Sequence, residues 1–246
     1  MSASFDIAAF AYAHRGLWGR KADENSLPAF QAAAAAGVGC ELDVRALKDG
    51  TLVVFHDATL DRMCNDPRRL DAITAEELAV LHLPDGSHIP TLEQALDAMD
   101  DLPVLIELKI NAPGSDLADR VATALSIRKG RCTVMSFDEP TVDRLRKLVT
   151  HRPVGQLIEG QMIEGLSQTS AEAAMAKAKR AIALGVDYLA PHVSALETVA
   201  AVAGGLPLVT WTVRDPAQLG HARIAGAAPI FEGFPADLAK QHGTPI

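Results

Sequence analysis

GCELDVRALKDGTLVVFH, residues 39–56, is the stretch of sequence that decides the fold. Its first part, 39–44, has the length and apolar character of a buried strand, and 51–56 is a second short run rich in β-branched residues. The Asp49-Gly50 pair between them is a strong hairpin signal. We therefore expect 51–56 to extend the first strand through a hairpin.

Two acidic residues interrupt the apolar strand 39–44. Because side chains alternate along a strand, the carboxylates of Glu41 and Asp43 point to one face, whereas Cys40 points to the other, toward helices. Burying an ionised carboxylate without a partner lowers the stability of the fold by several kcal/mol, as an order of magnitude. The pair therefore predicts cations or a metal on that face.

Outward from this stretch, short apolar strands alternate with segments of helical periodicity along the whole chain. We expect strands at 10–15, 39–44, 102–109, 132–137, 154–159, 187–193, 206–213 and 228–234. Eight such units without a break in composition indicate one (β/α)₈ TIM barrel, and hence a single domain over 1–246. The alternative is an open, doubly wound sheet, although no G-x-G-x-x-G motif follows the first strand.

Helix starts fall between these strands. Asp138 and Asp215 each stand before a first-turn proline, which is typical of a helix N-cap. Capping boxes are expected at three further places, Thr74…Glu77, Thr91…Gln94 and Ser194…Glu197. Residues 57–90 form the longest irregular segment, with one short helix expected near 75–81, and are interpreted as a short insertion over the barrel mouth.

Composition narrows the class of protein. The 246 residues carry a net charge of −8 and are 48% hydrophobic, which argues against a nucleic-acid or anionic-membrane surface but not against a small anionic substrate.

Three cysteines without regular spacing predict neither disulfides nor a zinc site. No apolar run reaches the ~18 residues of a membrane span. The N-terminal segment is a poor signal peptide, so we expect a cytoplasmic protein.

Charged residues gather at the predicted carboxyl ends of the first strands, where barrel enzymes place their active sites. They are His14, Arg15, Glu41, Asp43, His56, Glu107 and Lys109. Three carboxylates suit a hard cation such as Mg²⁺ or Ca²⁺. The structural alternatives are an ion pair of Glu107 with Lys109, pairing of the other two carboxylates with Arg15 or Arg45, and a core role for His14.

The remaining cations and histidines are interpreted as peripheral. Lys177 to Arg180 are expected on the solvent-exposed face of a helix. His192 ends a strand and is a candidate for the mouth. The others are expected at the surface or in structural positions: His82, His88, His151, His221 and His242.

The motifs together resemble the glycerophosphodiester phosphodiesterase family, in its small bacterial cytoplasmic form. They are AHRG (13–16), ENSLPAF (24–30), ELDVRALKDGTLVVFHDATLDR (41–62), IPTLEQAL (89–96), IELK (106–109) and TWTV (210–213). The resemblance implies a TIM barrel that hydrolyses glycerophosphodiesters to sn-glycerol 3-phosphate and an alcohol with one divalent metal ion. It also suggests that the glycerol 2-hydroxyl attacks first and that water then opens a cyclic phosphate.

The resemblance also implies roles for single residues. Glu41, Asp43 and Glu107 would be metal ligands, and His14 and His56 would be the general acid and base, in an order that the sequence leaves open. Substrate contacts would come from Arg15 and Lys109, which would hold the phosphate, and from Trp211 and Phe137, which would line the pocket. Glu24 and Asn25 would brace the site.

The chain departs from the family pattern at three places near the mouth. Asp23 stands where proline is usual, Arg214 where asparagine is frequent, and Glu232-Gly233 replaces the usual Thr-Asp. These departures bear on substrate preference more than on chemistry. Two other functions stay open: a lysophospholipase D-like phosphodiesterase, which would favour an exposed apolar rim, and an inactive barrel that binds glycerophosphodiesters.

Overall fold

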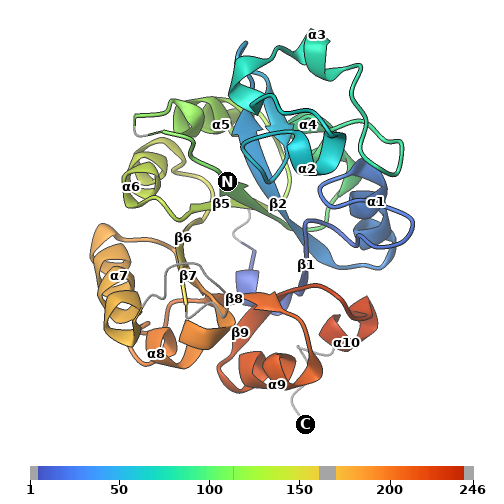
Figure 1. The fold of residues 1–246 in the computed structure, drawn as a ribbon. Coiled ribbons are helices and arrows are strands. Elements are labelled where there is room, and N and C mark those ends of the chain that lie inside the picture. The colour runs from blue at the N-terminus through green and yellow to red at the C-terminus, as the bar shows by residue number, and fades with distance from the viewer. Residues whose placement is uncertain (1–4, 113, 161–169, 241–246) are drawn as a thin grey trace.

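The computed structural model describes residues 5–112, 114–160 and 170–240. Within these ranges nine strands form one sheet, shown in Figure 1. The strands are β1 (Tyr12–His14), β2 (Gly39–Ala46), β3 (Leu52–Val54), β4 (Val104–Leu108), β5 (Cys132–Ser136), β6 (Val154–Ile158), β7 (Tyr188–Pro191), β8 (Leu208–Val213) and β9 (Ala227–Phe231).

The sheet closes on itself. Strand β1 pairs in parallel with β2 on one side and with β9 on the other, and β4 to β9 follow in parallel order between them. Strand β3 is the exception, because it pairs antiparallel to β2 through the predicted hairpin. The predicted (β/α)₈ barrel is therefore confirmed, and the open sheet is excluded.

Helices surround the barrel on the outside (Figure 1). They are α1 (Leu27–Ala35), α2 (Asp61–Cys64), α3 (Ala75–Leu78), α4 (Leu92–Ala98), α5 (Leu117–Ser126), α6 (Glu139–Leu148), α7 (Ala171–Leu184), α8 (Leu196–Ala200), α9 (Pro216–Ile224) and α10 (Ala236–Lys240). Three 3-10 helices are η1 (Ile7–Ala9), η2 (Leu70–Ala72) and η3 (Val193–Ala195). Across the described ranges, no helix is long and apolar enough to cross a membrane.

Apolar side chains form two layers. Alternate strand residues such as Tyr12, Leu105 and Tyr188 fill the barrel interior. Their neighbours, Cys40 among them, pack outward against the helices. This alternation confirms the expected direction of Cys40 and leaves the inward face of β2 to Glu41 and Asp43.

Most of the predicted helix starts are confirmed. The side chains of Asp138 and Asp215 accept from the backbone N–H groups three residues on, and the boxes at Thr74 and Thr91 have both of their hydrogen bonds. The box at Ser194 was wrong. There the chain turns first through η3, whose N-cap is His192, because the imidazole accepts from the Ser194 N–H.

The segment 57–90 is more ordered than expected. It holds α2 and η2 as well as the predicted α3, and its apolar residues form a small core with β3. Leu60, Leu70 and Ile73 are fully buried in this core. The core fixes the segment at the carboxyl end of β2, beside the barrel mouth.

Candidate active site

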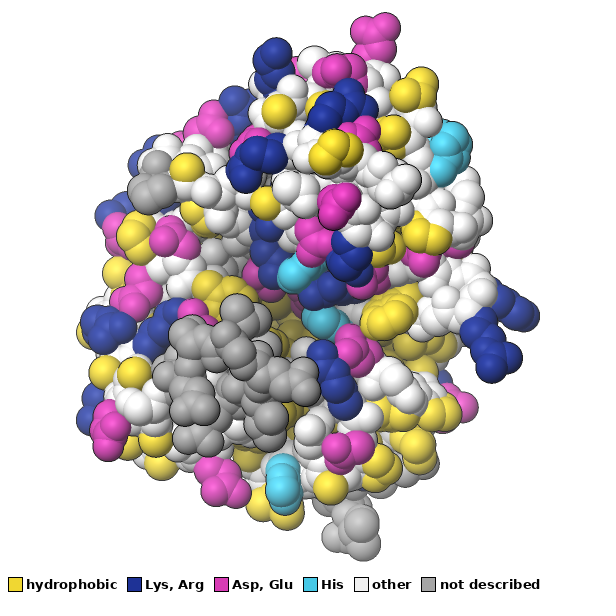
Figure 2. Space-filling view, in the orientation of Figure 1, with side chains coloured by type: hydrophobic (Ala, Val, Ile, Leu, Met, Phe, Trp, Pro, Cys, Tyr) yellow, Lys and Arg dark blue, Asp and Glu magenta, His cyan; other side chains and the backbone are white. Residues whose placement is uncertain are grey.

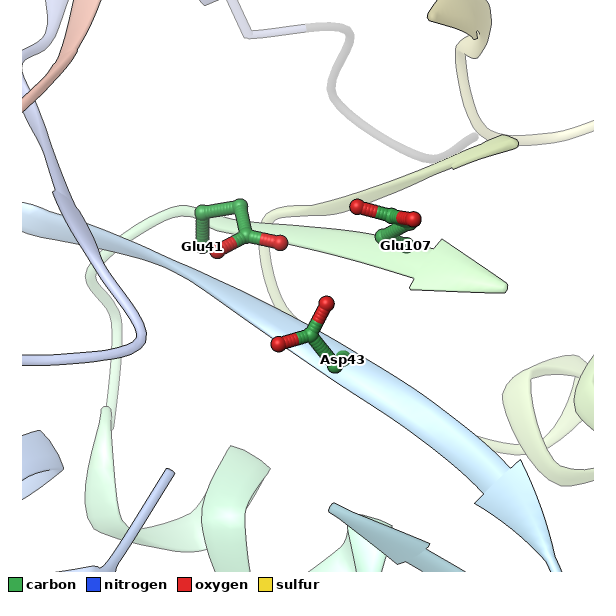
Figure 3. Close-up of side chains that lie close together, drawn as sticks. All are labelled: Glu41, Asp43 and Glu107. Carbon is green, nitrogen blue, oxygen red and sulfur yellow. The ribbon is translucent and has the colours of Figure 1, made fainter. Parts of the chain in front are cut away.

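Three carboxylates meet at the carboxyl ends of two neighbouring strands. Parallel pairing sets Asp43 of β2 opposite Glu107 of β4, and Glu41 lies two residues before Asp43 on the same face. Oxygen atoms of the three groups lie within 4.8 Å of one another. Figure 3 shows the carboxyl groups pointing toward a common space. All three residues are buried.

The pKa values of the three carboxyl groups are shifted in different directions. Burial raises the pKa of Glu41 well above its usual range, and the neighbouring Asp43 and Glu107 raise it further. Burial also raises the pKa of Glu107. Burial acts on Asp43 in the same direction, but Lys109 and Arg15 outweigh it and hold the pKa of that carboxyl well below its usual range. The cluster therefore has room for further positive charge next to Glu41.

Lys109 and Arg15 are the cations that contact the carboxylates. The Lys109 Nζ lies 2.6 Å from Glu107 Oε1 and 3.1 Å from Asp43 Oδ1. The Arg15 Nε lies 3.3 Å from Asp43 Oδ2. That Nε is buried and has no hydrogen-bond partner in the part of the chain that the structure describes. Such an unsatisfied buried donor is costly and is typical of a site that awaits an anion.

The turn after β1 presents Arg15 in a rare backbone conformation. Its φ is 59°, in the left-handed region, and the next residue, Gly16, has a φ of 82°. A Cβ on Gly16 would lie 2.8 Å from the Cβ of Ala29, so this close approach to α1 requires glycine. The backbone N–H of Arg15 points at Glu41 Oε2, 3.3 Å away.

Each of the two histidines has a carboxylate on Nδ1. His14 Nδ1 lies 2.5 Å from Glu232 Oε2, and its Nε2 lies 3.9 Å from Glu41 Oε2. His56 Nδ1 lies 2.7 Å from Asp57 Oδ1. Burial lowers the pKa of His56, against the opposing charge of Asp43. In Figure 2, histidine, basic and acidic side chains gather in the hollow at the centre of this face.

A second set of contacts braces the first. Asn25 Nδ2 donates to Asp43 Oδ2 over 2.8 Å. The Glu24 carboxylate accepts from Arg15 Nη1 at 2.8 Å and from Arg62 Nη2 at 2.5 Å. The same Arg62 donates from Nε to Asp57 Oδ2 at 2.6 Å. One guanidinium of α2 thus holds the carboxylates behind both Arg15 and His56.

Aromatic rings line the side of the mouth at β5 and β8. The Phe137 and Trp211 rings meet edge to face with centroids 5.2 Å apart, and the His192 ring lies 4.9 Å from Trp211. A cavity of about 430 Å³ opens beside them, lined by Glu107, Lys109 and Phe137 among others. Three of the predicted site residues thus line this cavity, and Trp211 and His192 adjoin it through the ring contact with Phe137.

The sequence interpretation missed several contacts here. Lys177 is not on the solvent face, because its Nζ bonds Glu159 at 2.8 Å and lies 5.6 Å from the centre of the Phe137 ring. The pairing of His14 with Glu232 joins opposite ends of the sequence, and no local pattern announces it. For Arg62, the available signal was its position six residues after His56 in the stretch 41–62.

The departures at the mouth have structural partners. Asp23 and Asp85 form a reciprocal pair in which the backbone N–H of each donates to the carboxylate of the other, at 2.8 Å and 2.6 Å. Proline at position 23 has no N–H for this contact. Arg214 Nε donates to Glu232 Oε1 at 2.6 Å, so two of the departing residues contact each other.

The other histidines that the structure describes lie away from the hollow. His82 and His88 stack with ring centroids 4.2 Å apart in the segment 57–90. His151 and His221 are exposed. His242 lies outside the described residues.

Comparison with known proteins gives a consistent result. Residues 14–236 match the Glycerophosphoryl diester phosphodiesterase family. A glycerophosphodiester phosphodiesterase of Caldanaerobacter subterraneus is 30% identical over 167 residues, which cover 62% of this chain and 68% of the relative.

Solved structures are similar in fold. A glycerophosphodiester phosphodiesterase from Thermotoga maritima has a TM-score of 0.71 at 26% identity and covers 94% of this chain and 96% of its own. An Oleispira antarctica phosphodiesterase, solved in complex with the product sn-glycerol-3-phosphate, has a TM-score of 0.79 at 21% identity and covers 93% and 94%. The matched residues include every charged group of the hollow, and the chain belongs to the glycerophosphoryl diester phosphodiesterase family.

Proposed function

We propose that this protein hydrolyses glycerophosphodiesters to sn-glycerol 3-phosphate and an alcohol at the barrel mouth. The observation that carries the proposal is the convergence of His14, His56, Arg15 and Lys109 around three buried carboxylates. Membership of the family and the product bound by the Oleispira relative support the same substrate class.

Arg15 and Lys109 would hold the phosphate. Arg15 Nε forms an ion pair with Asp43 but no hydrogen bond to a described residue, so its N–H can donate to a phosphate oxygen while Nη1 keeps its bond to Glu24. Lys109 adds a point charge on the side of the cavity, and burial keeps water from screening it. Phe137 and Trp211 would form the wall against which the rest of the substrate packs.

The carboxylate cluster fits a divalent cation. All of its donors are carboxylate oxygens, which Mg²⁺ and Ca²⁺ prefer. Burial and the neighbouring carboxylates raise the pKa of Glu41, and positive charge beside it would favour its ionised form. Glu41, Asp43 and Glu107 would hold the ion. When bound, it would supply positive charge to the phosphate oxygens.

His14 and His56 would move the protons. In the first step one imidazole takes the proton of the glycerol 2-hydroxyl as its oxygen bonds to phosphorus, and the other protonates the departing alcohol oxygen. In the second step water opens the cyclic phosphate, the two imidazoles exchange roles, and both return to their starting states. Each proton transfer contributes about 10²–10⁴-fold to the rate.

A coupled assay tests the function. Purified protein with Mg²⁺ or Ca²⁺ is expected to release sn-glycerol 3-phosphate from glycerophosphoethanolamine or glycerophosphocholine, detected by NAD⁺ reduction with glycerol-3-phosphate dehydrogenase. A choline-release arm with lysophosphatidylcholine runs in parallel, and a variant with both His14→Ala and His56→Ala gives the background. The proposal is overturned by no turnover of any glycerophosphodiester with either ion, or by turnover of the lysophospholipid alone.

A further inference from the structure

Glu232 occupies an unusual place for a carboxylate. It follows the last residue of β9, and its backbone N–H donates to the Val213 carbonyl at 3.0 Å, which fixes it to the end of β8. Its side chain is only 15% exposed. It is not one of the carboxylates that converge near Glu41. It lies on the other flank of β1, and His14 of β1 contacts both Glu232 and Glu41.

Both oxygens of this carboxylate are used. Oε2 contacts His14 Nδ1 at 2.5 Å, and Oε1 accepts from Arg214 Nε at 2.6 Å. With one partner on each oxygen, the side chain has a fixed orientation. Burial would raise the pKa of Glu232, but the contacts with His14 and Arg214 outweigh it and lower that pKa to about 2, so the group is ionised at neutral pH.

An ionised carboxylate can only accept a hydrogen bond. The short contact therefore requires the proton on His14 Nδ1. In the neutral imidazole this leaves the lone pair on Nε2, the nitrogen that lies 3.9 Å from Glu41 and faces the carboxylate cluster. The Trp18 Nε1 donates to the His14 carbonyl at 3.0 Å and holds the backbone beneath the ring.

We propose that Glu232 is a positioning residue, which holds His14 as the Nδ1–H tautomer and aims Nε2 at the reacting phosphate, with Arg214 fixing the carboxylate from behind. The inference rests on the proposed catalytic role of His14. It assigns a task to two residues at which the chain departs from the family pattern, and it leaves the choice between acid and base open, because Nε2 serves either role.

Two variants test the inference. Glu232→Ala removes the acceptor, so kcat is expected to fall by at least about tenfold with KM within about twofold, because Glu232 contacts the histidine and not the substrate. Glu232→Gln keeps the shape and one acceptor oxygen and is expected to lose less. Nitrogen-15 NMR of the imidazoles, with His14 assigned from a His14→Gln spectrum, should show Nδ1–H in the wild type and a mixture of tautomers in Glu232→Ala.

Glu139→Gln is the matched control. Glu139 forms a similar two-point ion pair, with Arg180, on the outside of the barrel. This variant is expected to keep the wild-type kcat and His14 spectrum, and circular dichroism confirms that each variant is folded.

The outcomes separate the inference from the function. Suppose the wild type is active but both variants, Glu232→Ala and Glu232→Gln, keep its kcat or its His14 tautomer. This result overturns the positioning role and leaves the proposed function intact. A wild type that turns over no diester, with a tautomer that still depends on Glu232, overturns the function and leaves the contact established.

Discussion

Both histidines of the hollow are built as imidazole–carboxylate pairs, with Glu232 behind His14 and Asp57 behind His56. In each pair the carboxylate fixes the Nδ1 side, so proton exchange is left to Nε2. The two pairs differ in their surroundings. Burial lowers the pKa of His56, whereas His14 has Glu41 next to its Nε2. Similar residues can thus serve opposite steps.

His14→Ala and His56→Ala should each lower kcat by at least about 10²-fold while the proteins stay folded, because each removes one proton transfer. A substrate with a p-nitrophenol leaving group needs no protonation, so it should restore the rate of the acid variant and leave the base variant slow. Stopped-flow absorbance at the nitrophenolate band measures both.

His221→Ala is the control for these variants, because His221 is exposed on α9, away from the hollow. A near-normal rate in either His14→Ala or His56→Ala would remove that residue from the proposed mechanism.

The Glu232 contact also predicts how stability depends on pH. The pKa of Glu232 in the folded protein is about 2, below the usual 4.5, so its stabilising contribution is complete above pH 4.5 and is lost as the pH falls toward 2. The difference in unfolding free energy between wild type and Glu232→Gln should therefore shrink by about 0.8 kcal/mol from pH 6 to pH 4. Urea denaturation at the two pH values measures it, and a difference that is constant with pH contradicts the lowered pKa.

At the level of elements, strands and loops contribute different residues to the site. The regular parallel pairing of β2 and β4 sets Asp43 beside Glu107. The loops add groups that we propose to meet substrate. Arg62 of the short helix α2 holds the carboxylates of Glu24 and Asp57, which lie behind Arg15 and His56. The segment 57–90 is thus part of the site, although none of its own residues after Asp57 faces the reacting centre.

Arg62→Ala should lower kcat/KM by about tenfold or more, since Glu24 and Asp57 both lose the partner that orients them. Its side chain is about half exposed, so the cost in stability should stay below about 1 kcal/mol. Steady-state kinetics and thermal unfolding on the same preparation separate the two effects.

Arg68→Ala is the matched control for Arg62. It lies in the same segment with similar exposure, and its partners Asp66 and Glu77 contact no proposed site residue. Equal losses of kcat/KM in the two variants would show that the effect is a general loosening of the segment.

The elements that the sequence predicts well are those with local causes. Strand alternation placed Glu41 and Asp43 on the inward face, and the Asp49-Gly50 turn produced the β2–β3 hairpin. The failures have other causes. Ser194 lost its expected cap to His192, a local competitor two residues away, whereas Lys177 turned inward to Glu159 from another element. The contact of His14 with Glu232 spans 218 residues and follows only from barrel closure.

At the level of the whole molecule, the net charge is −8, but positive side chains gather at the barrel mouth. Arg15 and Lys109 form a positive lining against the buried carboxylates of the hollow. An acidic protein can therefore bind a phosphodiester, because buried charges at short range outweigh the screened charge of the surface. The cytoplasmic location and the single domain over 1–246 stay predictions from the sequence.

Metal binding should be visible in the stability of the whole fold. An ion that binds the native cluster at 100 times its Kd adds about 2.7 kcal/mol, which raises Tm by about 5–10 °C in a chain of this size. Differential scanning fluorimetry with Mg²⁺, Ca²⁺ or EDTA measures the shift. Glu107→Gln should show much less of it and Glu139→Gln all of it; equal shifts in all three proteins contradict the ligand assignment.

The reciprocal pair of Asp23 and Asp85 has a consequence for how the mouth opens. Each carboxylate accepts from the other residue's backbone N–H, so separation of the two segments breaks both hydrogen bonds together. These bonds join two parts of the site into one cooperative unit. One part is the loop with Arg15 and Glu24, and the other is the segment with His56 and Arg62. We therefore expect the two segments to open and close together in local unfolding, so that both halves of the site form or are lost in one step.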